Sequence, residues 1–75
     1  MLRRKTILKR FGFIVKSYRR KMGLTQFELG NLVGIHRTYI GAIERGERNL
    51  TIMKVCEIAD ALERDLSSIW IEMSS

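Results

Sequence analysis

The chain has 75 residues, 45% of them apolar, and a formal net charge of +6, a composition that indicates one folded domain over residues 1–75 rather than a disordered tail. A chain this short buries only about 60% of the surface that its unfolded form exposes, so pairing with a second copy would help to stabilise it. It lacks the apolar run of ~18 residues that spans a membrane, and its charged residues interleave with apolar ones from the start, unlike a secretory signal. The single cysteine, Cys56, cannot form an internal disulfide and is typical of a reducing cytoplasm. One His and one Cys are too few for a zinc site, so no metal or other cofactor is expected.

The positive charge is concentrated at one end of the sequence. Residues 1–22 contain nine Lys and Arg and no acid, whereas the rest has five basic and all eight acidic residues. A basic end on a near-neutral body favours a polyanionic partner, with nucleic acid as the leading candidate. Two alternatives remain open, namely a transit peptide and a helix that lies on anionic lipid. Residues 1–6 are expected to form a basic tail, which either adds phosphate contacts or only keeps the protein in solution.

The first predicted helix covers roughly residues 7–22, where apolar residues lie three and four apart. Its apolar stripe consists of Ile7, Leu8, Phe11, Ile14, Val15, Tyr18 and Met22. The basic residues Lys9, Lys16, Arg19 and Arg20 fall outside this stripe. Gly23 can end the helix in the left-handed conformation.

Two short helices are predicted next. Thr25 stands three residues before Glu28, which is the spacing of a capping box and starts a helix over residues 26–33. Leu29, Leu32 and Val33 are expected to point inward, and Gly34 to end this helix. The following helix, residues 37–45, buries Ile40 and Ile43 and ends at Gly46.

Two further helices complete the predicted fold. Thr51 can cap a helix whose apolar face is Ile52, Val55, Ile58, Ala59 and Leu62. Asp65 can cap a last helix, residues 66–75, with a stripe of Leu66, Ile69, Trp70 and Met73, and with Ile71 outside it. Cys56 is expected to be a small core residue. The prediction is therefore an all-α fold, a compact bundle of five short helices with no sheet.

The tight Gly34-Ile35 connection between helices 26–33 and 37–45 is the plan of a helix-turn-helix. Gly30 and Gly41 lie inside these helices, where glycine costs about 1 kcal/mol relative to alanine. A close approach would explain both: Gly30 would let the second helix cross the first, and Gly41 would let DNA come near the second. The alternative is that either glycine is merely tolerated by packing.

With Ile40 and Ile43 buried, the exposed side of helix 37–45 is expected to hold Arg37, Thr38, Gly41, Ala42 and Arg45. Arg37 and Thr38 lie at its N-terminal end, the part of a recognition helix that reaches base edges in the major groove. An arginine can bind guanine O6 and N7 together, and a threonine offers a hydroxyl and a methyl group. The alternative is a solvated arginine and a threonine that caps the helix.

Residues 25–51 resemble the lambda-repressor-like helix-turn-helix family. Residues 36–40 and 43–49 are similar to the controller proteins of bacterial restriction-modification systems. The resemblance implies that Arg37 reads a guanine with Thr38 beside it. It also implies phosphate contacts from Gln26, Tyr39, Arg45, Arg48 and Asn49, whose amide, hydroxyl and guanidinium groups suit phosphate oxygens. Glu44 is expected to hold the end of its helix or nearby basic residues rather than meet DNA.

Two departures from the family pattern concern helix 26–33. Phe27 replaces an acid that is common there and that can join neighbouring dimers on DNA, so assembly by that route is in doubt. Gly30 replaces the usual alanine, which lowers helix propensity. His36 is expected to precede or cap helix 37–45.

The resemblance also implies that the last helix pairs with its twin. The expected interface residues are Leu66, Ile69, Trp70, Ile71 and Met73. A twofold dimer would place two recognition helices about 34 Å apart on a near-palindromic site. The alternative is a monomer with Trp70 in its own core.

The function expected from these observations is a transcription regulator, the controller of a restriction-modification system, in the bacterial cytoplasm and bound to the nucleoid. Its partners would be double-stranded DNA and a second copy, with two dimers on one operator as a further possibility, and neither a membrane nor a small molecule. A phage-type repressor, an antitoxin and a membrane-surface protein that binds through the basic first helix remain alternatives. An enzyme is not expected, because the sequence has no carboxylate pair with a base, no nucleophile beside His36 and no phosphate loop.

Overall fold

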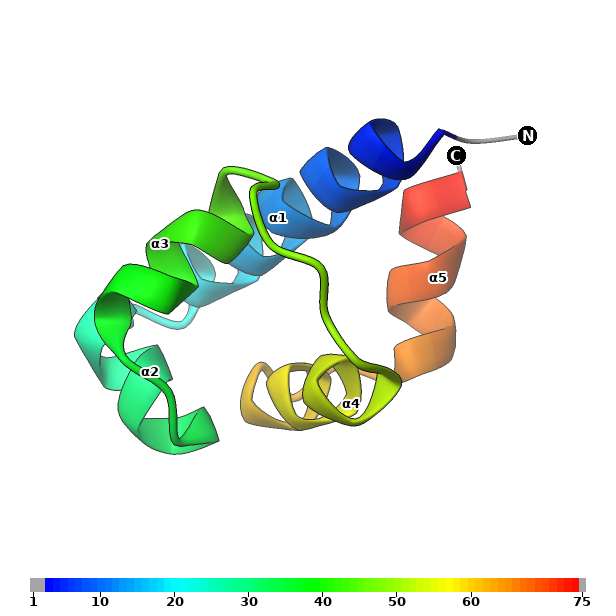
Figure 1. Ribbon diagram of the computed structural model, residues 1–75. Coiled ribbons are helices and arrows are strands. Elements are labelled where there is room, and N and C mark those ends of the chain that lie inside the picture. The colour runs from blue at the N-terminus through cyan, green and yellow to red at the C-terminus, as the bar shows by residue number, and fades with distance from the viewer. Residues whose placement is uncertain (1–2, 75) are drawn as a thin grey trace.

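The computed structural model describes residues 3–74, which contain five α-helices and no strand (Figure 1). In chain order they are α1 (Arg4–Lys21), α2 (Gln26–Val33), α3 (Arg37–Glu44), α4 (Ile52–Ala61) and α5 (Leu66–Ser74). The predicted all-α class is therefore confirmed. Within these residues, none of the helices is both long enough and apolar enough to cross a membrane.

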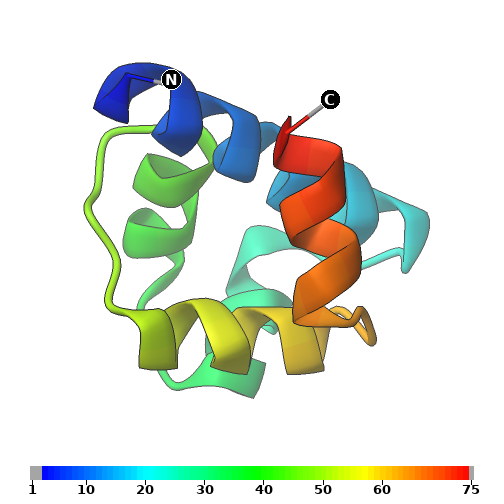
Figure 2. The same cartoon turned by 90° about the vertical axis from the view of Figure 1, so that its right-hand side faces the viewer.

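The helices surround one core in two groups. α3 packs against α1 and α2, while α5 packs against α1 and α4. Figure 2 shows α5 on the opposite side of the molecule from the chain that joins α3 to α4. Each helix contributes to the core, whose most completely buried side chains are Leu29, Ile40, Ile43, Ile58, Ile69 and Val15. α1 belongs to both groups, and α2 also packs against α4.

The predicted helix ends are largely confirmed. Thr25 Oγ1 accepts from the Glu28 backbone N–H at 3.0 Å, and Glu28 Oε1 accepts from the Thr25 N–H at 2.8 Å, which completes the capping box. Thr51 caps α4 by accepting from the Lys54 N–H at 3.1 Å. The three predicted glycine stops have φ angles of +73° or +74°, which a side chain would strain: Gly23, Gly34 and Gly46.

Two predictions about helix boundaries and faces are wrong. α1 begins at Arg4, so residues 4–6 form its first turn instead of a tail, and residues 1 and 2 of that predicted tail lie outside the described residues. Leu32 does not point inward and is 60% exposed. The buried side of α2 is formed by Leu29, Gly30 and Val33, and at 100° per residue Leu32 is rotated roughly 110° from its centre.

Polar contacts hold α5 to α1. The Tyr18 hydroxyl lies 2.8 and 2.9 Å from the carboxylate oxygens of Glu72, and the Arg10 guanidinium donates to the Met73 carbonyl at 2.6 Å. The Arg64 guanidinium lies 4.5 Å from the centre of the Tyr18 ring. Because its hydroxyl donates to a carboxylate, the pKa of Tyr18 is raised above its ordinary value.

Candidate nucleic-acid interface

The turn between α2 and α3 sets the angle at which the two helices meet. A Cβ at Gly30 would lie 2.5 Å from the Ile35 carbonyl oxygen, closer than atoms can approach. The predicted close approach at Gly30 is confirmed, although the chain that approaches is the turn backbone before α3. Any side chain at Gly30 would therefore push the start of α3 away from α2.

α3 buries Ile40 and Ile43, with 0% and 2% exposure, and leaves Arg37 and Thr38 exposed at its N-terminal end. The Arg37 side chain makes no hydrogen bond or ion pair with any other part of residues 3–74. His36, and not Thr38, caps the helix: its Nδ1 accepts from the Thr38 N–H at 3.1 Å and lies 2.8 Å from the Thr38 hydroxyl. The solvent-facing arginine that the sequence predicts is thus present, with a threonine held beside it.

The predicted exposure of Gly41 and Ala42 is wrong, since both are buried. The side chains of Gln26 and Arg45 cover Gly41, with the Gln26 Oε1 3.4 Å and the Arg45 Nη1 3.1 Å from the position of a Cβ there. Ala42 is 7% exposed, and its carbonyl accepts from the Glu47 N–H at 2.9 Å. The protein itself therefore occupies the space beside Gly41 that the sequence had suggested for DNA.

The other predicted phosphate-binding residues gather around the end of α3 and the segment after it. The Arg48 guanidinium lies 5.2 Å from the centre of the Tyr39 ring, and the exposed Arg45 forms an ion pair with Glu47 at 3.1 Å. Tyr39, Arg45 and Arg48 line a surface hollow of about 590 Å³ together with Thr38. Asn49 is exposed in the same segment but is not part of the hollow's lining.

A buried ion pair supports this surface from beneath. One of its residues is Arg19, so the prediction that Arg19 lies outside the buried stripe of α1 is wrong. The Arg19 side chain binds Glu44 through Nε at 2.6 Å and Nη2 at 3.1 Å, and the two side chains are 9% and 3% exposed. Glu44 also accepts from the Gln26 amide at 3.1 Å, which confirms that it holds neighbouring residues. Arg19 lies four residues after Val15 in α1, a spacing that could have shown that it shares the buried side. Gly12 was missed too, although its absent side chain lets α3 cross α1.

Residues 15–69 match the model of the helix-turn-helix family over the helices just described. The chain belongs to this family of DNA-binding regulators. It is 42% identical to the control protein C.SmaI of Serratia marcescens over 55 residues, a match that covers 73% of this chain and 66% of that protein. The part shared with C.SmaI thus amounts to about two thirds of that relative's length.

Two solved controller proteins have the same fold as this helix-turn-helix chain. The restriction-modification controller C.AhdI of Aeromonas hydrophila is 34% identical with a TM-score of 0.77, over 83% of this chain and 90% of that one. The wild-type controller C.Esp1396I is 34% identical with a TM-score of 0.81, over 91% and 87%. Structures of C.Esp1396I also include single substitutions at a consecutive arginine, threonine and tyrosine. This chain has the same three residue types in that order at positions 37–39.

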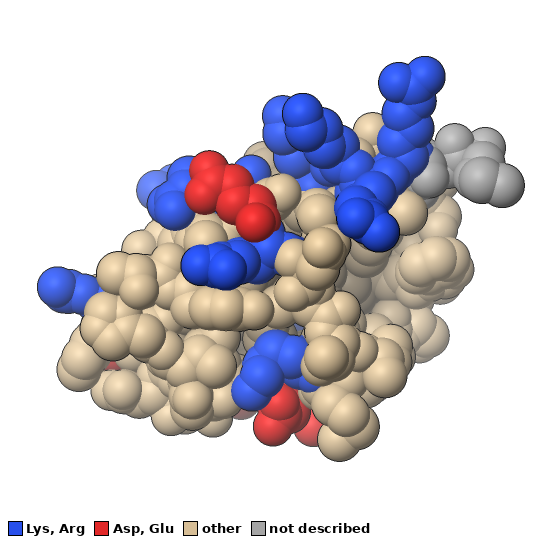
Figure 3. All heavy atoms as spheres, in the orientation of Figure 1, with Lys and Arg blue, Asp and Glu red and all other residues tan. Residues whose placement is uncertain are grey.

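The basic residues of α1 lie partly beside the helix-turn-helix. Lys9 packs against Gly46, directly before the segment that carries Arg48 and Asn49. Figure 3 shows Lys and Arg side chains over the N-terminal half of α1, on the face that also presents α3. Lys5 and Lys9 are exposed, as are Lys16 and Arg20 further along the helix. The positive charge of residues 3–22 therefore extends the basic surface beyond the motif.

The predicted interface residues on α5 divide into two sets. Ile69 and Met73 are 1% and 7% exposed because they fill the chain's own core, so the prediction that they meet a partner is wrong. Leu66, Trp70 and Ile71 are 39%, 61% and 65% exposed, and Trp70 does not belong to the core. Residue 75 of the predicted pairing helix lies outside the described residues. Cys56, expected in the core, is only half-buried.

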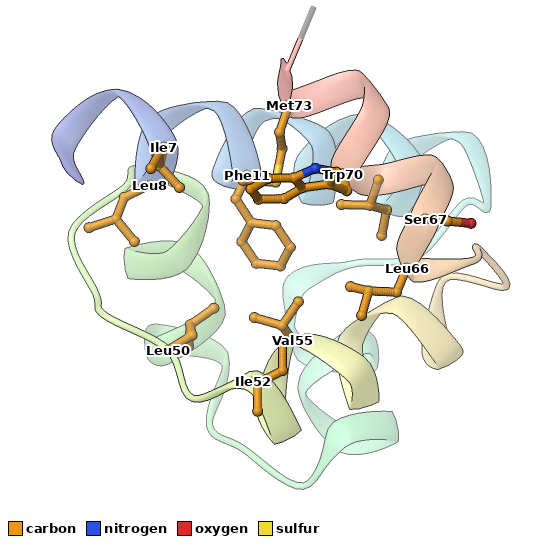
Figure 4. Close-up of a pocket in the computed structure, with 11 residues that line it drawn as sticks. Ile7, Leu8, Phe11, Leu50, Ile52, Val55, Leu66, Ser67, Trp70 and Met73 are labelled. Atoms are coloured by element: carbon orange, nitrogen blue, oxygen red, sulfur yellow. The ribbon is translucent and has the colours of Figure 1, made fainter. Parts of the chain in front are cut away.

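An apolar groove of about 520 Å³ runs beside the exposed part of α5 (Figure 4). Its lining comes from α1, α4, α5 and the segment before α4, and among the lining residues within 3–74 Ser67 alone has a hydroxyl group. Trp70 and Leu66 lie at this groove, and Ile52, 66% exposed, is on its α4 side. Among residues 3–74, no cluster of three His, Cys, Asp or Glu side chains could hold a metal ion.

Proposed function

We propose that the protein is the controller of a restriction-modification system, which binds a near-palindromic operator as a homodimer and regulates transcription there. The observation that carries this proposal is the N-terminal end of α3, where Arg37 is exposed and unpaired within residues 3–74 above a buried Ile40. The similarity to C.SmaI, C.AhdI and C.Esp1396I supports the choice of a controller among helix-turn-helix regulators.

In this proposal Arg37 reads a guanine, and Thr38 contacts the adjacent base. Arg37 can donate to O6 and N7 of the same base, which discriminates by about 1–3 kcal/mol. The His36 contacts support the role of Thr38, because they hold its hydroxyl at the end of the helix that would enter the groove. The base contact of Thr38 then depends on a side chain that is already positioned in the absence of DNA.

Phosphate contacts would come from the residues that border α3. Gln26 begins α2, while Arg45, Arg48 and Asn49 follow α3, and Tyr39 lies between them at the hollow. These contacts position the protein on the duplex without reading its sequence. The positive charge of Arg45 and Arg48 also makes binding fall with salt, because each neutralised phosphate releases counterions.

Pairing would use the exposed side of α5 and the groove beside it. Leu66, Trp70 and Ile71 present apolar surface that a 75-residue chain leaves uncovered, and a second copy would bury it. A twofold arrangement would place the two α3 helices about one DNA turn, roughly 34 Å, apart. Two such dimers could occupy one operator, and Phe27, 57% exposed on α2, offers them an apolar contact where the family commonly has an acid.

Footprinting on the DNA upstream of the protein's own gene tests this proposal. The expected result is protection of two symmetric segments whose centres lie about 10 base pairs apart, retained in the presence of excess scrambled duplex. Equal binding to scrambled duplex would overturn it. Binding to anionic vesicles with no duplex binding would favour the membrane-surface alternative, in which the basic side of α1 is the functional surface.

The neighbouring genes separate this proposal from other regulators on the same fold. A methyltransferase or nuclease gene beside it favours a restriction-modification controller, whereas a toxin gene favours an antitoxin and a phage gene cluster favours a repressor. The proposed place of action is the bacterial cytoplasm, at the nucleoid, since the proposed partner is chromosomal DNA.

A further inference from the structure

Three glycines lie inside helices, and one of them differs from the other two. A Cβ at Gly12 would lie 2.4 Å from the Ile43 carbonyl oxygen, and a Cβ at Gly30 would lie 2.5 Å from the Ile35 carbonyl oxygen. Both positions are therefore required by backbone of a neighbouring element. A Cβ at Gly41 meets no such backbone, since its nearest neighbours are the ends of the Arg45 and Gln26 side chains at 3.1 and 3.4 Å.

A glycine inside a helix lowers its stability relative to alanine, because the unfolded chain loses more freedom when it becomes ordered. At Gly12 and Gly30 the close packing of the backbone offsets this loss. At Gly41 no element comes closer because the side chain is absent, so the fold gains nothing there. The two side chains above it are both proposed phosphate contacts.

We infer that Gly41 is a positioning residue for DNA binding, whose missing side chain leaves the surface on which Gln26 and Arg45 come together. This inference rests on the proposed function. It assigns the glycine to the geometry of the contacts and not to the stability of α3.

The orientation of Gln26 is fixed by groups on the far side of its amide. A carboxylate can only accept, so the Glu44 Oε1 at 3.1 Å must receive an N–H from Gln26 Nε2. Glu44 is itself held by Arg19 in the buried ion pair. Both ends of the Gln26 amide then lie over Gly41, with Oε1 3.4 Å and Nε2 3.6 Å from the position of a Cβ there, so a methyl group would fill the space between the helix and this amide.

Arg45 reaches the same place from the other end of α3. It caps that helix, and its Nε pairs with Glu47 at 3.1 Å while its Nη1 lies over Gly41. The first residue of α2 and the residue that ends α3 thus place their polar groups side by side. An alanine at position 41 would shift the Arg45 guanidinium by a few tenths of an ångström, place a methyl group in contact with the Gln26 amide, and leave the backbone in place.

Gly41→Ala tests the inference because stability and DNA binding should change in opposite directions. We expect the melting temperature to rise by roughly 4 °C, as a better helix former replaces glycine on a chain of this size. We expect operator affinity at fixed salt to fall about three- to tenfold, and Gly41→Leu to lower it further. Gly30→Ala is the matched control, and it should lose both stability and binding.

A double-mutant cycle shows whether Gly41 acts through its two neighbours. In a Gln26→Ala/Arg45→Ala background, Gly41→Ala should leave operator affinity unchanged, because the groups that it displaces are gone. If Gly41→Ala in the otherwise unmodified protein leaves operator affinity unchanged, or lowers the melting temperature, the inference about Gly41 is wrong. The proposed function still stands in that case, provided that the unmodified protein binds its operator with a base preference that depends on Arg37. Absence of any duplex binding by the unmodified protein would overturn the proposed function as well.

Discussion

The α3 side and the α5 side of the molecule are both left uncovered by the chain, but they differ in chemistry. The α3 side presents exposed polar groups, several of which are held by other side chains, as Thr38 is by His36 and Gln26 by Glu44. The α5 side presents apolar groups around a groove that has one polar residue in its lining. The α3 side is thus shaped for directional contacts, whereas the α5 side gains energy only from the area it buries.

The two sides are also supported differently. A buried ion pair between α1 and α3 lies beneath the first surface, while an exposed hydrogen bond between Tyr18 and Glu72 joins α1 to the second. Since water screens exposed contacts, the α3 side should be much more sensitive to loss of its support.

Glu44→Ala should lower the free energy of unfolding by about 3–5 kcal/mol, because it leaves the Arg19 charge buried without a partner. Thermal or urea denaturation measures the loss. The matched control is Glu57→Ala, which removes an exposed ion pair to Lys54 at 3.0 Å and should cost about 1 kcal/mol or less. If the two variants lose the same free energy of unfolding, the buried ion pair stabilises the protein no more than the exposed one.

Trp70→Ala should weaken pairing by about 2 kcal/mol or more, since an exposed tryptophan at an apolar groove has the character of a hot spot. Sedimentation should show a shift toward monomer, with weaker operator binding as a consequence. Phe27→Ala removes a similarly exposed aromatic ring from the α2 side and should leave the dimer intact. A dimer that survives Trp70→Ala would locate the interface elsewhere.

Arg37→Ala should cost about 1–3 kcal/mol of operator binding and relax the preference at one base pair in each half-site. Binding to a set of operators with single base-pair changes measures both effects. Arg20→Ala, an exposed arginine on α1, serves as the control and should leave base preference unchanged. If Arg37→Ala weakens every sequence equally, Arg37 contacts phosphate and does not read a base.

Arg48→Ala should lower affinity for all duplexes alike and reduce the slope of log affinity against log salt by about one unit, as expected for loss of one phosphate contact. The stacking of Arg48 on Tyr39 places this charge at the hollow that Thr38 also lines, whereas Arg37 is not part of that lining. Titration at several salt concentrations gives the slope. A slope that does not change would remove Arg48 from the interface.

Tyr18→Phe should have the smallest effect. It should remove the loss of stability that accompanies deprotonation of Tyr18 at alkaline pH. The raised pKa of Tyr18 means that its hydrogen bond to Glu72 stabilises the fold fully below the unfolded-state pKa, about 10, and that this contribution is lost as pH rises through the folded-state pKa. The melting temperature should therefore fall less steeply between pH 8 and 11 for Tyr18→Phe than for the unmodified protein. Identical pH profiles would show that the bond contributes nothing measurable.

Local signals in the sequence were sufficient to predict the helices. Caps such as Thr25 and the glycine stops act within a few residues, so the bounds of α2 were predicted without error. The same holds for α3 up to its last residue, since the neighbouring Arg45 is its cap. The exposed positions of Arg37 and Thr38 followed from the period of the helix once Ile40 was buried.

The errors arose where the burial of a side chain depends on a partner far away in the chain. Arg19 can be buried because it forms an ion pair with Glu44, 25 residues later in the chain. Gly41 is covered by Gln26 from the preceding helix, and Ile69 enters a core that four other helices build. A period of 3.6 residues defines the faces of a helix, but only the fold decides which face meets a neighbour.

One consequence of the shared position of α1 concerns the spacing of operators. The same helix is joined to α3 by the Arg19–Glu44 ion pair and packs against α5 in the core, so it would hold the N-terminal end of α3 at a fixed distance from the proposed twofold axis. One extra base pair between half-sites moves the second by about 3.4 Å and turns it by roughly 35° around the duplex. Two recognition helices held at a fixed spacing cannot follow that rotation. The protein would then discriminate among operators by the spacing of their half-sites as well as by their base sequence.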